Sequence, residues 1–318
     1  MTGGPSMEDA IVKAIRERGP LTGGELREAL GPNGFVQWKT CRQSPRLLLR
    51  RVGKRYLRLD RKVEGYARLS PSILREFLTY SVVGLATEGV ALGARADALA
   101  THIEQIGEAK LRLARRLISE IGAQVLEPGA TGAGSRPGSA GEEDRFCVLL
   151  AGDIVYGMAH DAPRPEKSTG RMVRGSDIDL VVLMDDQAPE ELATRLDEAI
   201  YQQKYRYMIN PSLREEIDYT IKPLSKFREQ SRFDGIKDMV PCKIIDEAIL
   251  LYGSERLFRA AKDLLNVNGV PEKLAAMDEE AARSREVAER HLLSRDQEHL
   301  SGDDLYLFYT SEETEEFD

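Results

Sequence analysis

The chain has 318 residues, enough for two or three domains, and a hydrophobic content of 42% excludes wholesale disorder. Its three cysteines (Cys41, Cys147 and Cys242) are too widely spaced for a metal-ligand motif or a disulfide framework. No apolar run approaches the roughly 20 residues that span a bilayer, and residues 1–8 lack the blocks of a signal peptide. We therefore expect a cytoplasmic protein with reduced thiols and no membrane partner.

Charge is distributed unevenly along the chain. Residues 1–62 hold 14 Lys and Arg against 6 Asp and Glu, a net charge of +8, so the remainder carries −16 of the total of −8. A basic head on an acidic body indicates a nucleic-acid partner for the head. The acidic body is also explained by solubility alone.

Residues 1–64 are expected to form a winged helix-turn-helix-like domain. Helices are predicted over 7–18, over 26–30 after a capping box of Thr22 and Glu25, and over about 34–43. Two strand-like runs, 47–52 and 55–59, would form the hairpin wing. In such a module the third helix reads the major groove and cations on the wing meet phosphates. The expected nucleic-acid contacts are Lys39, Arg42, Arg50, Arg51, Lys54 and Arg55. The alternative is a small helical domain with a solvated basic face that docks a protein.

The next two segments carry little chemistry. Residues 65–127 are predicted to be a helical connector, with a long amphipathic pattern over 95–121. Residues 128–144 are rich in Gly, Ser, Ala and Pro, which is typical of a flexible linker or loop.

The chemistry is expected in a catalytic core at residues 145–235. An apolar strand over 146–150 leads through Gly152 into a short helix at 154–159, and a polar loop over 160–173 precedes a strong strand at 174–183. Alternation along that strand would place Asp177 and Asp179 on one face. Two carboxylates so close are costly unless a cation neutralises them, and their oxygens suit Mg²⁺ or Mn²⁺.

A third carboxylate is expected from the strand at 215–221, which follows a helix over 189–207. Asp218 would extend toward the first pair, with Glu216 on the same face as the second choice. Three carboxylates can hold two metal ions, of which one activates a hydroxyl and the other binds a triphosphate. Asp218 would also help to remove the proton of the nucleophile.

The stretch Gly175-Ser176-Asp177-Ile178-Asp179-Leu180, after a strand and a glycine turn and before a strand with another Asp, resembles the DNA polymerase β-like nucleotidyltransferase superfamily, in particular its small bacterial members. The resemblance covers residues 145–260. It implies that Gly152 is the turn glycine and that Asp177, Asp179 and Asp218 are the catalytic metal ligands. We expect nucleotide contacts from Gly152, Asp153, Gly175, Ser176, Lys222 and Lys243.

Two features depart from the pattern of that superfamily. Asp153 stands where Ser or Gly is usual, and a carboxylate there would repel triphosphate unless it turns away to cap the helix. The 24 residues between Gly152 and Asp177 exceed the usual span, which indicates an inserted loop. The cations of that loop are candidates for holding triphosphate or a nucleic-acid strand, or are simply solvated: Arg164, Lys167, Arg171 and Arg174.

Residues 236–318 are expected to form a C-terminal helical region, with helices over 243–265 and 271–293 and an acidic tail. The fold class predicted for the whole chain is α+β, with a short mixed sheet and flanking helices in the catalytic core.

The sequence thus predicts a nucleotidyltransferase that uses two Mg²⁺ or Mn²⁺ ions. It would transfer NMP from an NTP to a nucleic-acid end or a protein hydroxyl, as in bacterial defence or toxin systems, with release of pyrophosphate. Two alternatives remain open. One is a nucleic-acid-binding regulator that uses the fold to sense nucleotide, and the other is a synthase of oligonucleotide messengers. Small-molecule acceptors fit the basic head less well.

Overall fold

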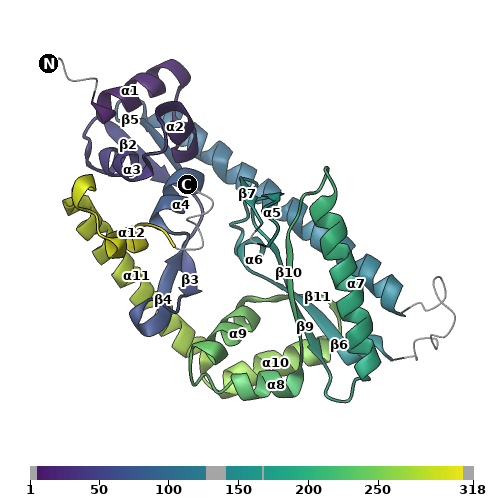
Figure 1. Cartoon of the computed structure of the whole chain (residues 1–318). Helices are drawn as coiled ribbons and strands as arrows, with labels where there is room; N and C mark the ends of the chain where they lie inside the picture. Colours follow the sequence, from purple (N-terminus) through teal and green to yellow (C-terminus); the bar gives the residue numbers. More distant parts are fainter. Residues whose placement is uncertain (1–5, 127–140, 167, 311–318) are drawn as a thin grey trace. The chain divides into compact units, whose positions relative to one another are not determined.

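The structure, a computed structural model, describes residues 6–126, 141–166 and 168–310 (Figure 1). It confirms a mixed α+β protein with several small sheets. The chain divides into two compact units, the first formed by Met1–Ile103 and Met277–Asp318 and the second by Glu104–Ala276. Most of the predicted linker, Lys167 and the tail from residue 311 lie outside the described residues. Within the described ranges, no helix is long and apolar enough to cross a membrane.

The first unit combines a helical cluster with two small antiparallel sheets, of order β1-β5-β2 and β3-β4. Its elements are α1 (Met7–Arg18), β1 (Leu21–Thr22), α2 (Gly23–Leu30), α3 (Gly34–Gln43), β2 (Leu47–Arg51), β3 (Tyr56–Leu59), η1 (Glu64–Tyr66), β4 (Ala67–Ser70), α4 (Ile73–Tyr80), β5 (Ser81–Leu85), the start of α5 (Gly89–Leu126), the end of α11 (Val270–Ser294), η3 (Gln297–His299) and α12 (Gly302–Phe308). The predicted capping box is confirmed: Thr22 accepts a hydrogen bond from the Glu25 N–H, and the Glu25 side chain accepts one from the Thr22 N–H.

The predicted hairpin wing is wrong. Strand β2 pairs along its whole length with β5, and β3 pairs with β4, so the runs at 47–52 and 55–59 are not partners. All five residues of β5 are buried, and Val83 is central to the core. A strand buried on both faces has no alternating pattern, so its sequence resembles a buried helix. The expected helical connector is therefore confirmed at α4 and α5 but wrong at β4 and β5, and β4, α4 and β5 belong to the first unit.

The C-terminal end of the chain packs against α3. The Phe308 ring lies 5.3 Å from the Phe35 ring and 5.4 Å from the Trp38 ring, and Phe308 is 2% exposed. The same core contains Leu292 of α11. Helix α3 is thus an interior element of this unit, held by residues that are more than 250 positions away in the sequence.

The second unit is built on one mixed sheet of order β10-β9-β6-β11, in which β10 is parallel to β9 and the other pairs are antiparallel. Its elements are the rest of α5, η2 (Glu143–Arg145), β6 (Phe146–Ala151), α6 (Asp153–Tyr156), β7 (Pro163–Pro165), β8 (Met172–Arg174), β9 (Ile178–Met184), α7 (Glu190–Ile209), β10 (Ile217–Pro223), α8 (Leu224–Gln230), α9 (Ile236–Glu247), β11 (Ile249–Gly253), α10 (Glu255–Val267) and the start of α11.

Helices α5 and α7 cover one face of this sheet, where Ile178, Leu180 and Val182 are buried as expected (Figure 1). Helices α8, α9 and α10 contact strands β10, β6 and β9. The predicted helix over 243–265 is wrong in its middle, because β11 interrupts it and pairs with β6. The sheet therefore extends beyond the expected limit of the catalytic core at residue 235.

Replacing Phe308 with Ala should destabilise the first unit by about 3–5 kcal/mol, because it removes a ring from the contact with Phe35 and Trp38 and leaves a cavity. Trp38 is the one tryptophan of the sequence, so urea unfolding followed by its fluorescence reports on this unit. The exposed Val287 provides the control, since Val287→Ala should change the unfolding free energy by no more than about 0.5 kcal/mol. Equal midpoints for the two variants would contradict the packing of α12 on α3.

Candidate functional site

Two carboxylates lie side by side on neighbouring strands of the second unit. In the parallel ladder Asp218 of β10 is paired with Asp179 of β9, and Ala151 of β6 is the partner of Asp179 on its other side. Paired residues on adjacent strands share a face and lie roughly 5 Å apart. The expectation that Asp218 approaches the first pair of carboxylates from a neighbouring strand is met by this register.

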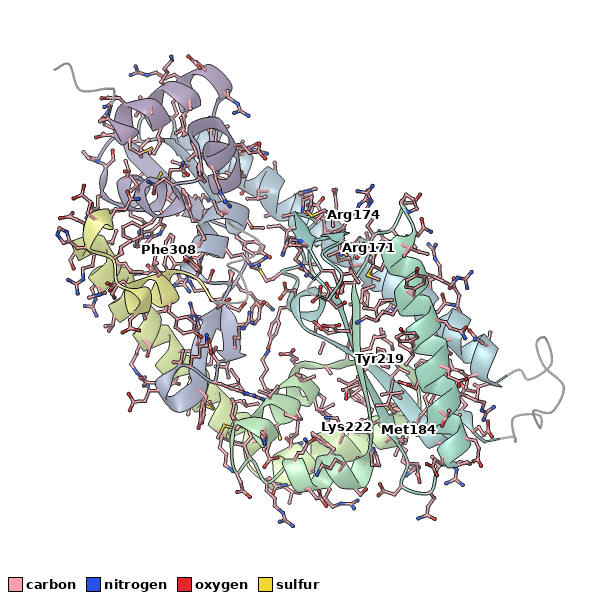
Figure 2. The ribbon with its side chains drawn as sticks, in the orientation of Figure 1. Arg171, Arg174, Met184, Tyr219, Lys222 and Phe308 are labelled. Atoms are coloured by element: carbon pink, nitrogen blue, oxygen red, sulfur yellow. The ribbon has the colours of Figure 1, made fainter. Side chains whose placement is uncertain are left out.

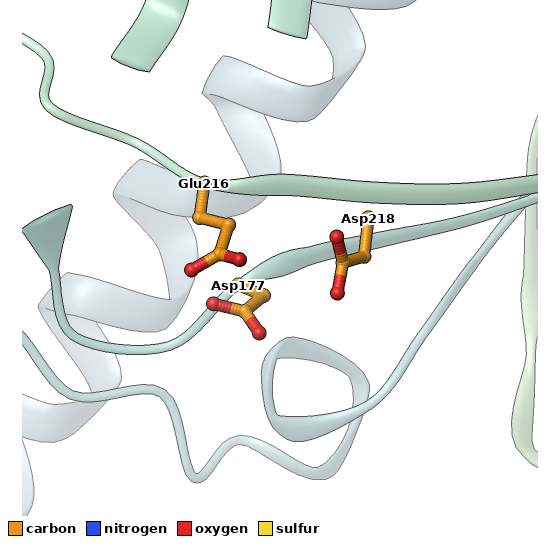
Figure 3. Close-up of side chains that lie close together, drawn as sticks. All are labelled: Asp177, Glu216 and Asp218. Atoms are coloured by element: carbon orange, nitrogen blue, oxygen red, sulfur yellow. The ribbon is translucent and has the colours of Figure 1, made fainter. Parts of the chain in front are cut away.

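Asp177 lies just before β9 rather than within it, which corrects the predicted strand over 174–183. Residues 175–177 form a bend between β8 and β9. Asp177, Glu216 and Asp218 each offer a carboxylate oxygen within 4.8 Å of the others (Figure 3). This group differs from the predicted triad, because Glu216 joins it and Asp179 lies beside it.

Arg164, from the inserted loop, neutralises part of this cluster. Its guanidinium forms ion pairs with Asp177 and, at 2.9 Å, with Glu216, and its Nε–H donates to the Gly175 carbonyl at 2.8 Å. Burial nevertheless raises the pKa of Glu216, against the opposing effect of Arg164. Arg164 therefore contacts the proposed metal ligands directly, a contact that the sequence did not predict.

The Asp179 carboxylate is partly buried among other carboxylates. Burial raises its pKa to about 7, and the neighbouring carboxylates of Asp153, Asp218 and Glu247 raise it as well, while Lys243 opposes them. The carboxylate lies against Gly152, where a Cβ would come within 2.2 Å of Asp179 Oδ2. Gly152 also has a φ of +75°, so both its conformation and its closeness to Asp179 require glycine.

Glu247 of α9 occupies the glycine turn. The Gly152 N–H donates to Glu247 Oε1 at 3.0 Å, and the Tyr156 hydroxyl donates to Glu247 Oε2 at 2.5 Å. Lys243 forms an ion pair with Glu247 and lies over the Tyr156 ring. The backbone N–H expected to bind phosphate is thus bonded to a carboxylate of the chain itself. No sequence pattern predicted the contact of Glu247 with Gly152, since the two residues lie 95 positions apart.

Asp153 and Ser176 bond to one another. The Ser176 hydroxyl donates to Asp153 Oδ2 at 2.9 Å and accepts from the His160 N–H at 3.1 Å. Asp153 is the first residue of α6, and Gly152 takes the N-cap position. Gly175 has a φ of +56°, and a Cβ there would lie 1.8 Å from the His160 carbonyl oxygen. These contacts fix the bend that places Asp177.

The predicted phosphate-binding lysines are separated by the fold. Lys222 shares the face of Asp218 but is four residues further along β10, about 13 Å away. Its ammonium donates to Gln230 Oε1 at 3.3 Å, and burial lowers its pKa (Figure 2). Lys243, by contrast, acts on Asp179 and contacts Glu247. Of the two, Lys243 is the one that the fold brings to the carboxylates.

The cations predicted to bind nucleic acid are mostly engaged within the first unit. Lys39 donates to the Arg295 carbonyl, Arg42 pairs with Glu289 at 3.5 Å, and Gln43 beside them donates to the Leu293 carbonyl at 2.9 Å. Residues of α11 and of the turn after it therefore contact the predicted recognition face of α3, where Arg42 and Gln43 remain exposed.

The basic residues of the expected wing are paired in a similar way. Arg55 makes two hydrogen bonds to Glu76 at 2.6 and 2.7 Å and one to Glu289 at 2.7 Å. Arg51 pairs with Glu76 and Arg50 with Asp97, both at 3.6 Å, and Lys54 also interacts within the chain. Contact of these side chains with nucleic acid stays a prediction, and it would require these internal pairs to open.

In comparisons with known proteins, no family model and no curated protein matches the chain.

Replacing Asp179 with Asn should stabilise the second unit at pH 8 by roughly 2–4 kcal/mol in metal-free buffer. A carboxyl whose pKa is raised from 3.8 to about 7 stabilises the folded protein below pH 4, and this stability is lost as the pH rises to about 7. The Asn amide does not ionise, so the variant does not lose stability in this way as the pH rises. The difference in unfolding free energy between the variant and the wild type should therefore grow between pH 4.5 and 8. Urea unfolding followed by far-UV circular dichroism measures it.

The matched control is Asp234→Asn, at an exposed position of the same unit. Its effect should be within about 0.5 kcal/mol at every pH. A pH-independent difference for the Asp179 variant would show that the buried charge of Asp179 does not oppose folding.

Proposed function

We propose that this chain is a metal-dependent nucleotidyltransferase that transfers NMP from an NTP to a macromolecular acceptor. The observation that carries the proposal is the convergence of Asp177, Asp179 and Asp218 at one end of β9 and β10. Three carboxylates so arranged suit two divalent ions in an in-line displacement. The resemblance of Gly175-Ser176-Asp177-Ile178-Asp179 to the DNA polymerase β-like superfamily supports the same reaction.

The residues present fit Mg²⁺ or Mn²⁺. Carboxylate oxygens are the donors that these ions prefer. The raised pKa of Asp179 means that added positive charge beside it would stabilise its ionised form. Asp177, Asp179 and Asp218 would hold the ions, which when bound would neutralise the triphosphate and lower the pKa of the acceptor hydroxyl.

The reaction would proceed by attack of the acceptor hydroxyl on the α-phosphorus of the NTP. The new bond joins that oxygen to phosphorus, the bond to the β-phosphate breaks, and pyrophosphate leaves. Asp218, whose side chain is 54% exposed, is placed to take the proton of the hydroxyl. Arg164 would fix the orientation of Asp177, and Lys243 would balance the charge of Glu247 beside the site.

Incubation with each α-³²P-labelled NTP and Mg²⁺ or Mn²⁺ should give labelled product in the presence of nucleic acid or protein acceptors. The Asp177→Ala/Asp179→Ala variant should lose activity by about 100-fold or more, because charge stabilisation at the reacting phosphate is lost. The Asp234→Asn variant should keep wild-type activity. Incorporation that survives loss of both aspartates would exclude this site as the catalytic one.

A second candidate function, nucleotide sensing without transfer, is favoured by the contact of Arg164 with Asp177 and Glu216. In that case a guanidinium of the chain permanently takes the place of a metal ion. NTP binding in calorimetry, without label transfer to any acceptor and without dependence on divalent ions, would support the sensor over the transferase.

A further inference from the structure

The outward face of helix α7 carries a stripe of large side chains. Tyr201, Tyr205 and Ile209 are 66%, 53% and 41% exposed. Their spacing of four residues places them in one row along the helix. The opposite side of α7 supplies the buried residues of the core, among them Leu196, Ile200, Gln203 and Tyr207. A row of two exposed tyrosines and an isoleucine is unlike the isolated apolar side chains usual on a surface and indicates a binding function.

Cations collect at the C-terminal end of this row. The Arg174 N–H donates to the Arg214 carbonyl at 2.8 Å, so β8 runs beside the turn that follows α7. Thr169 Oγ1 lies 3.8 Å from Met208 Sδ, so the loop between β7 and β8 also reaches α7. Four exposed arginines are gathered here: Arg171 and Arg174 (Figure 2), Arg206 and Arg214.

The guanidinium groups of these four arginines form no hydrogen bond or ion pair with the described part of the chain. They differ in this from the cations of the first unit, most of which are paired with acidic side chains. Arginines without acidic partners that flank exposed tyrosines are complementary to a polyanion that has flat rings.

The row leads directly to the proposed catalytic carboxylates. Lys204, which lies three residues after Tyr201 and therefore next to it on the helix surface, forms an ion pair of 3.0 Å with Asp218. Strand β10 is the edge strand of its sheet, so Asp218 lies at the border between the sheet and α7. A ligand that covers the tyrosines can therefore extend to Asp218 without crossing another strand.

We propose that this surface, named here the α7 surface and made of Tyr201, Lys204, Tyr205, Ile209, Arg171, Arg174, Arg206 and Arg214, binds single-stranded nucleic acid as the acceptor of the transferase. The inference rests on the proposed function for the transfer step, whereas the binding itself is independent of it. Unpaired bases stack on tyrosine rings with about 1–3 kcal/mol per base, and arginines neutralise the phosphates. The bases of a duplex are stacked within it and are not accessible to the tyrosines. An acidic peptide would pair with the arginines but would not account for the exposed tyrosine rings.

The stacking is tested with full-length protein and a 16-nucleotide mixed-sequence RNA or DNA carrying a 5′-fluorescein, in EDTA and without NTP. Fluorescence anisotropy should show that Tyr201→Ala/Tyr205→Ala weakens binding by about 30-fold or more, since two stacked bases contribute at least about 2 kcal/mol and 1.4 kcal/mol is a factor of ten. Tyr201→Phe/Tyr205→Phe keeps the rings and should bind within about 3-fold of the wild type. Circular dichroism checks that both variants are folded.

The role of the arginines is tested through the salt dependence of the same binding. Arg171→Ala/Arg174→Ala should lower the slope of log K against log salt concentration by about 1.4, because each phosphate contact on a single strand contributes about 0.7. Arg232→Ala/Arg259→Ala, which removes two exposed arginines elsewhere in the second unit, should leave the slope unchanged.

Three outcomes would overturn the inference. The first is equal affinity of the wild type and the alanine double variant, and the second is tighter binding of the duplex than of the single strand. The third is a dimer in light scattering that the tyrosine variants dissociate, which would make the surface an interface between copies of this chain. Oligonucleotide binding with the expected variant effects, but without label transfer, would leave the surface supported and refute only the transferase.

Discussion

The second unit depends on the placement of several carboxylates at one end of the strands β9 and β10. Like charges in a partly buried site repel one another, and each loses hydration, so the arrangement is stable only where cations or donors are positioned to meet it. The compensating contacts come from four different elements: Arg164 of β7 to Asp177 and Glu216, Lys110 of α5 to Glu215, Lys204 of α7 to Asp218, and Lys243 of α9 to Glu247.

Because the carboxylates need cations beside them, α5 and the inserted loop, to which the sequence assigned no catalytic role, are structural parts of the site. Lys110 is buried within α5, and its ammonium bonds Glu215 and, at 2.8 Å, the Arg174 carbonyl. Burial lowers the pKa of Lys110 and raises that of Glu215, so each partner depends on the other to remain charged. The inserted loop brings Arg164 to the bend before β9. The pKa of Asp179 nevertheless stays raised, to about 7, and the proposed metal ions would lie beside this carboxylate.

The two units differ in how their cations are paired. The basic excess of the first 62 residues is largely matched by acids of the same unit, with Glu76 and Glu289 each meeting more than one arginine. Burial of Arg285 within this network lowers its pKa to about 10. Much of the positive charge of this segment is therefore paired within the unit, although most of its Lys and Arg side chains remain exposed. The arginines around the end of α7 belong to an acidic stretch of sequence, and their guanidinium groups are exposed and form no ion pair with the described part of the chain.

The sequence by itself determined the features that depend on neighbours along the chain. These are the helices α1 to α3 with the capping box of α2, the strands β6 and β9, helix α7, and the glycines at 152 and 175. Periodicity and capping are local, so a single sequence is enough to recognise them. Tertiary structure alone decided that β2 pairs with β5 and β3 with β4, that β11 joins the sheet of the second unit, and that Arg164 and Glu247 contact the proposed site. Strand pairing and ion pairing join residues distant in sequence, and their free energy depends on burial and geometry that no local pattern contains.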